Sequence, residues 1–322
     1  MGQLVMKQIA VVGLGLMGCS IIVSFLRAGY DVVGVAPIPD EAATGKLRIR
    51  EQLHLCQEMG LLHQDIEYYE SRLLISDDYA DLKYSQLVVE CVIEVFDIKK
   101  HVYNRIEEVV EKTAIIATNT SAIPISQLQK FLQHPERFMG IHWAEPAFAT
   151  RFLEITCGES TDLALAEGIS QEAEKWEKEP TLLYKDIRGF ITNRLMYAVY
   201  RQGFELINEE YVSMSGLDKC FQYDIGSWIT LMGIFRRMDY IGLDHYRKSY
   251  AHIFPKLSNS PSVPQQMKHI AAIQGRGIHN LKGLYPHTDE SAKKLEHRLV
   301  SFNKEIYSLA ERYRNKLKNI NL

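Results

Sequence analysis

The stretch K-Q-I-A-V-V-G-L-G-L-M-G-C-S, Lys7–Ser20, decides the fold of this chain. Residues 9–12 form a continuous apolar run, which is typical of a strand buried on both faces of a parallel sheet. Gly13, Gly15 and Gly18 then spell G-x-G-x-x-G, and a helical pattern of apolar residues follows them. Glycines so placed between a strand and a helix predict a dinucleotide-binding unit, in which phosphates rest on the free N–H groups of the helix N-terminus.

The second predicted strand, Asp31–Val35, lacks one feature of this pattern. An acidic residue should follow it to bond the adenosine ribose, but Ala36 stands there. Asp40 and Glu41 come a few residues later and are candidate substitutes. No Arg stands at this point to accept a 2′-phosphate, so the residues leave both NAD and NADP open. The cofactor-binding residues predicted from this region are Gly13, Gly15, Leu16, Met17, Gly18 and Ala36.

The composition excludes several classes of protein. The chain has 322 residues, enough for two domains, and a formal net charge of −3. This charge predicts neither a nucleic-acid partner nor a membrane-surface partner, and no apolar run reaches membrane-spanning length. The N-terminus enters the first strand directly, so no signal peptide is expected. The five cysteines show no C-x-x-C spacing, which favours reduced thiols in a cytoplasmic protein; no metal site is predicted.

Strands and helices alternate as far as Asp186, which predicts a doubly wound domain around a parallel sheet. A charged helix is predicted over residues 41–69. After Gly189 the strand pattern disappears and long helical patterns follow. We therefore predict an α/β Rossmann-type domain over residues 1–186 and an all-α C-terminal domain over residues 187–322. The predicted strands after the second are 73–75, 87–92, 114–117, 138–142, 152–156 and 181–184.

The last predicted helix begins near Thr288. Its apolar residues recur every three to four positions from Leu295 to Leu317. Such a stripe packs either on its own domain or against a second subunit, and the pattern leaves both alternatives open.

The stretch R-F-M-G-I-H-W-A-E-P-A-F-A-T-R-F-L-E-I contains His142 and Glu154 on either side of Pro146. Pro146 opens a loop and Phe152 begins a returning strand, a geometry that can bring the carboxylate against the imidazole. A carboxylate fixes the orientation and tautomer of a histidine, which can then accept a hydroxyl proton while hydride leaves the same carbon. A lone strand histidine is more often structural, so the neighbouring motifs decide its interpretation.

Five motifs occur in order: V-V-G-L-G-L-M-G, V-V-E-C-V-I-E with Lys99 downstream, A-T-N-T-S, G-I-H-W-A-E-P with L-E-I, and G-F-I-T-N-R-L. Together they resemble the 3-hydroxyacyl-CoA dehydrogenase family over nearly the whole chain. The resemblance implies an NAD-binding Rossmann-type domain and a helical domain through which members commonly form homodimers. It also implies a reversible oxidation of a secondary alcohol to a ketone, with hydride passing between NAD(H) and the 3-hydroxy carbon of an acyl-CoA.

By motif position, the resemblance implies that His142 is the catalytic base and Glu154 its partner. Ser121 matches the hydroxyl that bonds the substrate oxygen, and Asn193 the amide that holds the substrate carbonyl or its enolate form. From the residues alone, Ser121 equally suits a helix cap and Asn193 an ordinary polar contact. The residues matched to the cofactor are Glu94 and Lys99, at the nicotinamide end, and Asn119.

Departures from the family pattern leave the substrate open. Glu145 stands where the family usually has Asn in H-x-x-N-P, which alters the charge near the base and could reject an anionic substrate. Branches of the family with such changes act on small compounds without CoA, such as gulonate, carnitine and vitamin B6 breakdown products. Lys46, Arg48 and Arg50 could instead grip the phosphates of CoA. The alternatives are a dehydrogenase of a small hydroxy acid or alcohol and, given Ala36 and Glu145, a non-catalytic dinucleotide-binding protein.

Overall fold

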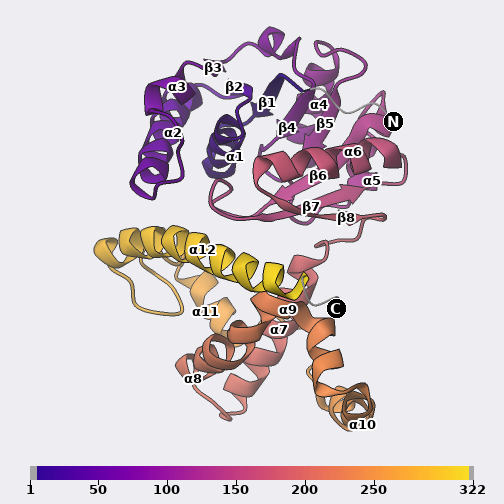
Figure 1. Cartoon of the computed structure of the whole chain (residues 1–322), viewed down its shortest axis with the longest axis vertical. Coiled ribbons are helices and arrows are strands. Elements are labelled where there is room, and N and C mark those ends of the chain that lie inside the picture. Colours follow the sequence, from indigo (N-terminus) through magenta and orange to yellow (C-terminus); the bar gives the residue numbers. More distant parts are fainter. Residues whose placement is uncertain (1–5, 319–322) are drawn as a thin grey trace. The chain divides into compact units, whose positions relative to one another are not determined.

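The computed structural model describes residues 6–318, except for the side chains of His245, Ala292, Lys293, Glu296 and residues 314–318. The chain forms two compact units, Met1–Asn193 and Arg194–Leu322 (Figure 1). The first unit has a sheet flanked by helices and the second is built of helices, which confirms the predicted fold class. The segment that follows Asp186 still bonds to the first unit, because the Gly189 N–H donates to the Ala122 carbonyl. The domain boundary near Asp186 stays a prediction.

One sheet organises the first unit, in the strand order β3-β2-β1-β4-β5-β6-β7-β8. Every neighbouring pair is parallel except β6 and β7, which run antiparallel. The sheet is thus mostly parallel, and β7 is the returning strand predicted after Pro146, because the loop between β6 and β7 is too short for a crossover helix. The strands are β1 (Gln8–Val12), β2 (Asp31–Val35), β3 (Leu73–Ser76), β4 (Leu87–Glu90), β5 (Ile115–Thr118), β6 (Phe138–Trp143), β7 (Phe152–Cys157) and β8 (Glu179–Leu183).

The helical stretch predicted over residues 41–69, with Gly60 as its interruption, forms two helices. Gly60 adopts a φ of 62°, a left-handed conformation that commonly ends helices, and Asp65 caps a new helix by accepting the Tyr68 N–H. The helices of this unit are α1 (Leu16–Arg27), α2 (Glu41–Glu58), α3 (Ile66–Glu70), α4 (Phe96–Glu107), α5 (Ile125–Gln129) and α6 (Leu163–Ala173), with short 3-10 turns at Tyr79–Leu82, Pro135–Arg137 and Glu174–Trp176.

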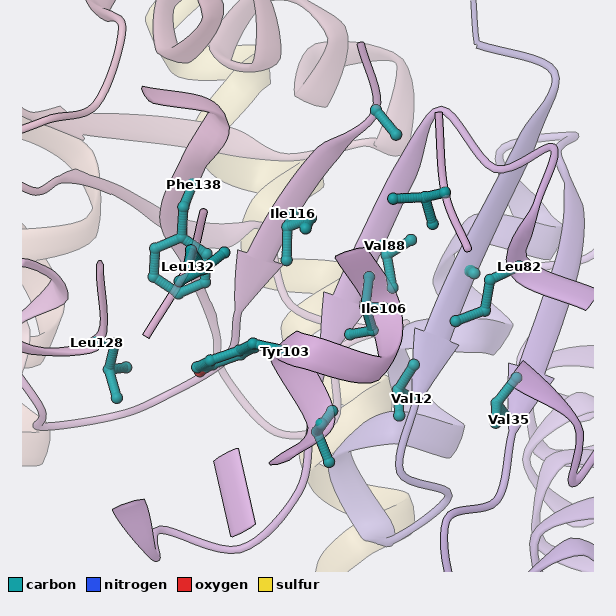
Figure 2. Packing of buried hydrophobic residues seen from close by; sticks show 14 of the residues in the cluster. Val12, Val35, Leu82, Val88, Tyr103, Ile106, Ile116, Leu128, Leu132 and Phe138 are labelled. Carbon is teal, nitrogen blue, oxygen red and sulfur yellow. The ribbon is translucent and has the colours of Figure 1, made fainter. Parts of the chain in front are cut away.

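The core of the first unit lies between the sheet and its covering helices. Figure 2 shows Val12, Val88 and Ile116 on adjacent strands facing Tyr103 and Ile106 of α4, all of them buried. Apolar area removed from water in this way is the main favourable contribution to folding. The packed sheet provides a rigid base for the loops at its carboxyl ends, where ligands bind in open α/β folds.

Helix α7 (Thr192–Asn208) begins at the end of the first unit and continues into the second. Gly233 interrupts α9 with a φ of 70°, and the long terminal helix α12 packs against α9 (Figure 1). No helix among residues 6–318 is both long enough and apolar enough to cross a bilayer. The remaining elements are α8 (Met214–Cys220), a π-helical turn (Phe221–Ile225), α9 (Gly226–Ile241), α10 (Leu243–Ile253), a 3-10 turn (Phe254–Lys256), α11 (Gln265–Ala272) and α12 (Asp289–Lys318).

Candidate active site

The antiparallel register of β6 and β7 brings His142 and Glu154 together. The two residues lie directly opposite each other, and Nδ1 of His142 is 2.8 Å from Oε2 of Glu154. Opposite residues of antiparallel strands present their side chains on the same face, so a strand–loop–strand unit is sufficient to form the pair. Both residues are buried. Since the carboxylate occupies Nδ1, Nε2 is the nitrogen left for proton transfer.

The second carboxylate oxygen of Glu154 is bound by the first residues of α7. Oε1 accepts the N–H of Ile191 at 3.1 Å, and the N–H and hydroxyl of Thr192 at 2.9 and 3.2 Å. Burial alone would raise the pKa of Glu154, but the hydrogen bonds from His142 and from these N–H groups outweigh it and hold the pKa below its ordinary value. Glu154 is therefore a carboxylate held ionised beside the imidazole. No spacing singles out Thr192, although it lies beside Asn193 in G-F-I-T-N-R-L.

Glu154→Gln is expected to make the protein less stable at neutral pH and less sensitive to acid. Because its pKa is lowered by folding, Glu154 contributes stability above its ordinary pKa of about 4.3, and this contribution is lost as pH falls through the lowered value. Urea unfolding at pH 7 and in steps down to about pH 3 measures both effects. Glu58→Gln, at an exposed position of α2, is the control. An unchanged acid dependence in Glu154→Gln would contradict an ionised, paired carboxylate.

Ser121 and Asn193, far apart in sequence, also meet. The side-chain Nδ2 of Asn193, in the first turn of α7, donates to the carbonyl of Ser121 at 2.8 Å. The Ser121 residue is exposed, and its hydroxyl makes no hydrogen bond within the described part of the chain. Since Thr192 precedes Asn193 and binds Glu154, one chain of contacts joins all four predicted catalytic residues.

Glu94 and Asn119, predicted as cofactor residues, both brace this region. Oε1 of Glu94 accepts the Thr120 hydroxyl at 2.8 Å and the Ser121 N–H at 3.1 Å. The Asn119 side-chain oxygen accepts the N–H of Trp143 at 3.0 Å, which ties the end of β5 to the end of β6. In this structure both side chains thus hold the loops around the dyad, and their contact with the cofactor remains a prediction.

Lys99, matched to the nicotinamide end, is buried, with 1% of its surface exposed, and its place beside the cofactor stays a prediction. Its Nζ lies 2.8 and 2.9 Å from the two carboxylate oxygens of Glu90 and 3.4 Å from Oε2 of Glu94. Glu90 is fully buried and also accepts the hydroxyls of Tyr103 at 2.7 Å and Thr118 at 2.8 Å. This cluster was detectable only as a Glu at the end of the apolar run L-V-V-E. Lys99 therefore connects a buried carboxylate to Glu94, which holds Ser121.

The glycine loop fits the pyrophosphate of a dinucleotide. Gly13 has a φ of 98°, and a Cβ on Gly18 would lie 1.9 Å from the Gly13 carbonyl oxygen, so neither position accepts a side chain. Gly15, the residue before α1, has no atom within 4 Å of an added Cβ. An open backbone approach at a helix N-terminus is the arrangement that phosphate groups require. Leu16 and Met17 complete the first turn of α1, exposed and half-buried respectively.

The ribose end of the loop differs from the usual pattern. The Ala36 side chain is buried and offers no acceptor. Glu41 is already engaged, because its Oε1 accepts the Leu14 N–H at 3.0 Å, while Arg48 donates to the Leu14 carbonyl at 3.1 Å. Burial raises the pKa of Glu41, although the Leu14 N–H opposes that shift. Of the two candidate substitutes, Asp40 is the exposed one.

The chain is similar to known proteins over most of its length. The family models for the NAD binding domain and the C-terminal domain of 3-hydroxyacyl-CoA dehydrogenase match residues 8–187 and 189–285. A 5-formyl-3-hydroxy-2-methylpyridine 4-carboxylate 5-dehydrogenase of Mesorhizobium japonicum is 30% identical over 293 residues, covering 90% of this chain and 94% of that protein. An L-carnitine dehydrogenase of Oceanobacillus iheyensis is 27% identical over 316 residues, covering 96% and 99%. A crystal structure of a dehydrogenase for the same pyridine compound, described as an NAD⁺-dependent dismutase, matches with a TM-score of 0.87 and 27% identity, covering 95% of this chain and 99% of that one.

Proposed function

The chain belongs to the 3-hydroxyacyl-CoA dehydrogenase family, and on that premise we propose that it is an NAD-dependent dehydrogenase of a small hydroxy acid or alcohol that carries no CoA. NAD dependence and action on a CH–OH group follow from the family and its relatives. The observation that carries the catalytic part of the proposal is the His142–Glu154 pair, 2.8 Å apart, with Nε2 of the imidazole left for a substrate proton.

Two observations support a substrate without CoA. The relatives described above are named for a pyridine carboxylate and for carnitine, neither of which is a thioester. Two of the three basic residues that could bind the phosphates of CoA already have partners. Arg48 donates to the Leu14 carbonyl, and Arg50 lies 3.5 Å from Glu70. Of the three basic residues, Lys46 alone is exposed and makes no hydrogen bond or ion pair within the described part of the chain. An acyl-CoA, from which the family takes its name, is the alternative substrate.

The residues would share the chemistry as follows. His142 takes the substrate hydroxyl proton on Nε2, and Glu154 stabilises the imidazolium and keeps the ring oriented. The Ser121 hydroxyl and the Asn193 amide hold the substrate oxygen. NAD, when bound, supplies the acceptor for the hydride that leaves the same carbon.

The cofactor would be held at the glycine loop. Its pyrophosphate would meet the backbone between Gly13 and Gly18 at the N-terminus of α1, where the helix dipole favours negative charge. The exposed Asp40 is the residue we assign to the ribose hydroxyls in place of Ala36. The intact chain of contacts from His142 to Ser121 argues against the alternative of a non-catalytic binding protein.

Reduction of NAD⁺, followed at the absorbance of NADH, tests the proposal. The substrates are L-carnitine, a panel of small hydroxy acids and hydroxymethyl pyridine carboxylates, and 3-hydroxybutyryl-CoA, each repeated with NADP⁺. Turnover of a compound without CoA at a kcat/KM above about 10⁴ M⁻¹s⁻¹, the lower end for natural substrates, is the expected result. Turnover of 3-hydroxybutyryl-CoA alone would establish the acyl-CoA alternative. Binding of NADH without turnover of any compound in the panel would favour the non-catalytic dinucleotide-binding protein.

We further propose that the protein is a homodimer through the helical unit. Helix α12 buries Val300 and Ala310 but leaves five large apolar side chains between 43% and 58% exposed, which is typical of an interface. Sedimentation equilibrium is expected to give twice the mass of the chain, and Phe302→Glu is expected to give the monomer. A monomeric parent protein would contradict the proposal. The five exposed residues are Leu295, Leu299, Phe302, Leu309 and Tyr313; the side chain of Leu317 lies outside the described residues.

All five cysteines are free, and three of them are buried. Free thiols persist in reducing compartments, so we propose that the protein is cytoplasmic. Fractionation of the source cells tests this location.

A further inference from the structure

The loop over residues 144–150 joins the two halves of the dyad. It leaves β6 two residues after His142, begins with Ala144 and Glu145, and leads into β7, which carries Glu154. Inside the loop, the Thr150 hydroxyl donates to the Ala144 carbonyl at 3.1 Å. A displacement of this loop would therefore move the ends of both strands and, with them, the imidazole and Glu145.

A single buried lysine holds this loop from outside. Lys178, just before β8, donates from Nζ to the carbonyls of Ala147 and Thr150, both at 2.5 Å. Its Nζ also lies 5.3 Å from the ring centroid of Trp143, the residue after His142. Lys178 is 5% exposed, and no carboxylate of the described residues lies within ion-pair distance of its Nζ.

Helix α1, whose N-terminus carries the glycine loop, also binds the 144–150 loop. The Ser20 hydroxyl accepts the Ala147 N–H at 2.7 Å, and Arg27 donates to the carbonyl of Phe148. The second guanidinium nitrogen of Arg27 lies 2.7 Å from Glu177, next to Lys178. The loop is thus fixed between the dinucleotide-binding helix and the start of β8.

Burial of an ammonium group without an anionic partner is unfavourable, because the group loses its hydration. Two short charge-assisted hydrogen bonds to the 144–150 loop and the aromatic face of Trp143, at the end of β6, are the compensating contacts here. A buried lysine used only to fill space would be replaced by an apolar side chain without loss. The contacts instead place its charge on the segment that carries the dyad.

We propose that Lys178 is a positioning residue of the active site, which holds the 144–150 loop and so orients His142 and Glu145 toward the substrate. Its kinetic consequence depends on the proposed function, whereas its effect on the loop does not. Lys178 itself does not touch the reacting atoms.

The charge of Lys178 responds to pH in the range where the enzyme is assayed. Burial lowers the pKa of Lys178 to about 7, with Arg27 of α1 and Arg151 of the loop end acting in the same direction and Glu177 opposing them. Arg151 in turn lies 3.7 Å from Glu179. A neutral amine donates weaker hydrogen bonds than an ammonium, so the loop should be held less firmly above this pH.

Hydrogen–deuterium exchange of the folded protein tests the proposal. In Lys178→Met, which keeps an unbranched stem, the amides of residues 147–150 are expected to exchange roughly tenfold faster or more, since a buried charge-assisted donor is lost. Lys178→Arg should restore much of the protection. Lys112→Met, an exposed lysine of the same unit, should change nothing. Unchanged exchange of the loop in a folded Lys178→Met would overturn the proposal.

Kinetics supply the second readout. Lys178→Met is expected to lower kcat by about tenfold or more, with the Kd for NADH unchanged, because the loop orients the reacting groups and does not hold the cofactor. A variant with normal kcat would overturn the positioning role. If the parent turns over no substrate, the proposed function fails, while exchange of the loop still decides whether Lys178 holds it.

If Lys178→Met does not fold, the pH dependence of hydrogen exchange in the parent protein tests the proposal instead. After correction for the intrinsic pH dependence of exchange, residues 147–150 should lose protection between about pH 6 and pH 8.5, relative to β5. Constant relative protection over this range would overturn the proposal.

Discussion

Replacement of His142 by Ala is expected to reduce kcat by about 10³-fold or more, toward the upper part of the range for loss of a general base. The imidazole is the group whose free Nε2 can take the hydroxyl proton, since Nδ1 is held 2.8 Å from Glu154. No other imidazole is placed against that carboxylate within the described residues. The measurement is steady-state NADH formation with the substrate found in the panel, at saturating substrate and cofactor.

The affinity for NADH separates this effect from misfolding. The glycine loop lies on β1 and α1, and none of its recorded contacts involves His142, so the Kd for NADH should stay within about twofold in His142→Ala. His101→Ala, at an exposed position of α4, is the matched control and should keep full activity. A His142→Ala variant that retains more than about a tenth of the parent kcat would mean that another group is the base.

Replacement of Glu90 by Ala is expected to destabilise the first unit by about 3–5 kcal/mol, the cost of leaving one member of a buried ion pair without its partner. Glu90 and Lys99 are both almost fully buried and lie 2.8 Å apart. The substitution leaves the buried ammonium with only the partly exposed carboxylate of Glu94, 3.4 Å away, and also removes the acceptor of the Tyr103 hydroxyl. Denaturant unfolding at pH 7, followed by the emission of Trp143 and Trp176, measures the loss.

Two variants test the cause of this loss. Glu58→Ala, an exposed glutamate, should change the free energy of unfolding by less than about 0.5 kcal/mol. Glu90→Ala combined with Lys99→Met should recover part of the stability, because the unpaired charge is removed together with its partner. If the double variant is as unstable as Glu90→Ala, the stranded charge of Lys99 is not the reason for the loss.

The Glu90–Lys99 pair also bears on the site. Lys99 reaches Oε2 of Glu94, and Oε1 of Glu94 holds the Ser121 N–H and the Thr120 hydroxyl. The buried Glu90–Lys99 pair thus supports, through Glu94, the loop that carries Ser121. Such supporting contacts keep site residues in place, because a loop by itself is less rigid than the elements that it joins.

Local patterns in the sequence were sufficient for the fold and for much of the site. The glycines at 13 and 18 could be interpreted because their constraint is steric and lies within one turn of chain: a Cβ on Gly18 meets the carbonyl of Gly13. The strand positions followed from runs of apolar residues, and the change to helices followed from their period. The resemblance of five motifs to one family then identified His142, Glu154, Ser121 and Asn193 as candidates, and the structure joins them in one chain of contacts.

The tertiary structure decided what each polar side chain is bound to. The sequence motifs marked Lys99 as a candidate residue, but its burial against Glu90 depends on how α4 packs on β4. The strand predicted to return after Pro146, β7, runs antiparallel to β6, and only the structure gives the register that sets Glu154 opposite His142.

The sequence by itself thus determined the glycine loop and the succession of strands and helices along the chain, because these depend on local sterics and on the period of apolar residues. The candidate residues came from the resemblance of its motifs to one family. Only the folded chain determined the partners. Lys178 meets the carbonyl of Ala147 across 31 positions, and Glu154 meets Thr192 across 38. Hydrogen bonds and ion pairs depend on distances of about 3 Å between atoms, and packing alone brings such distant residues that close.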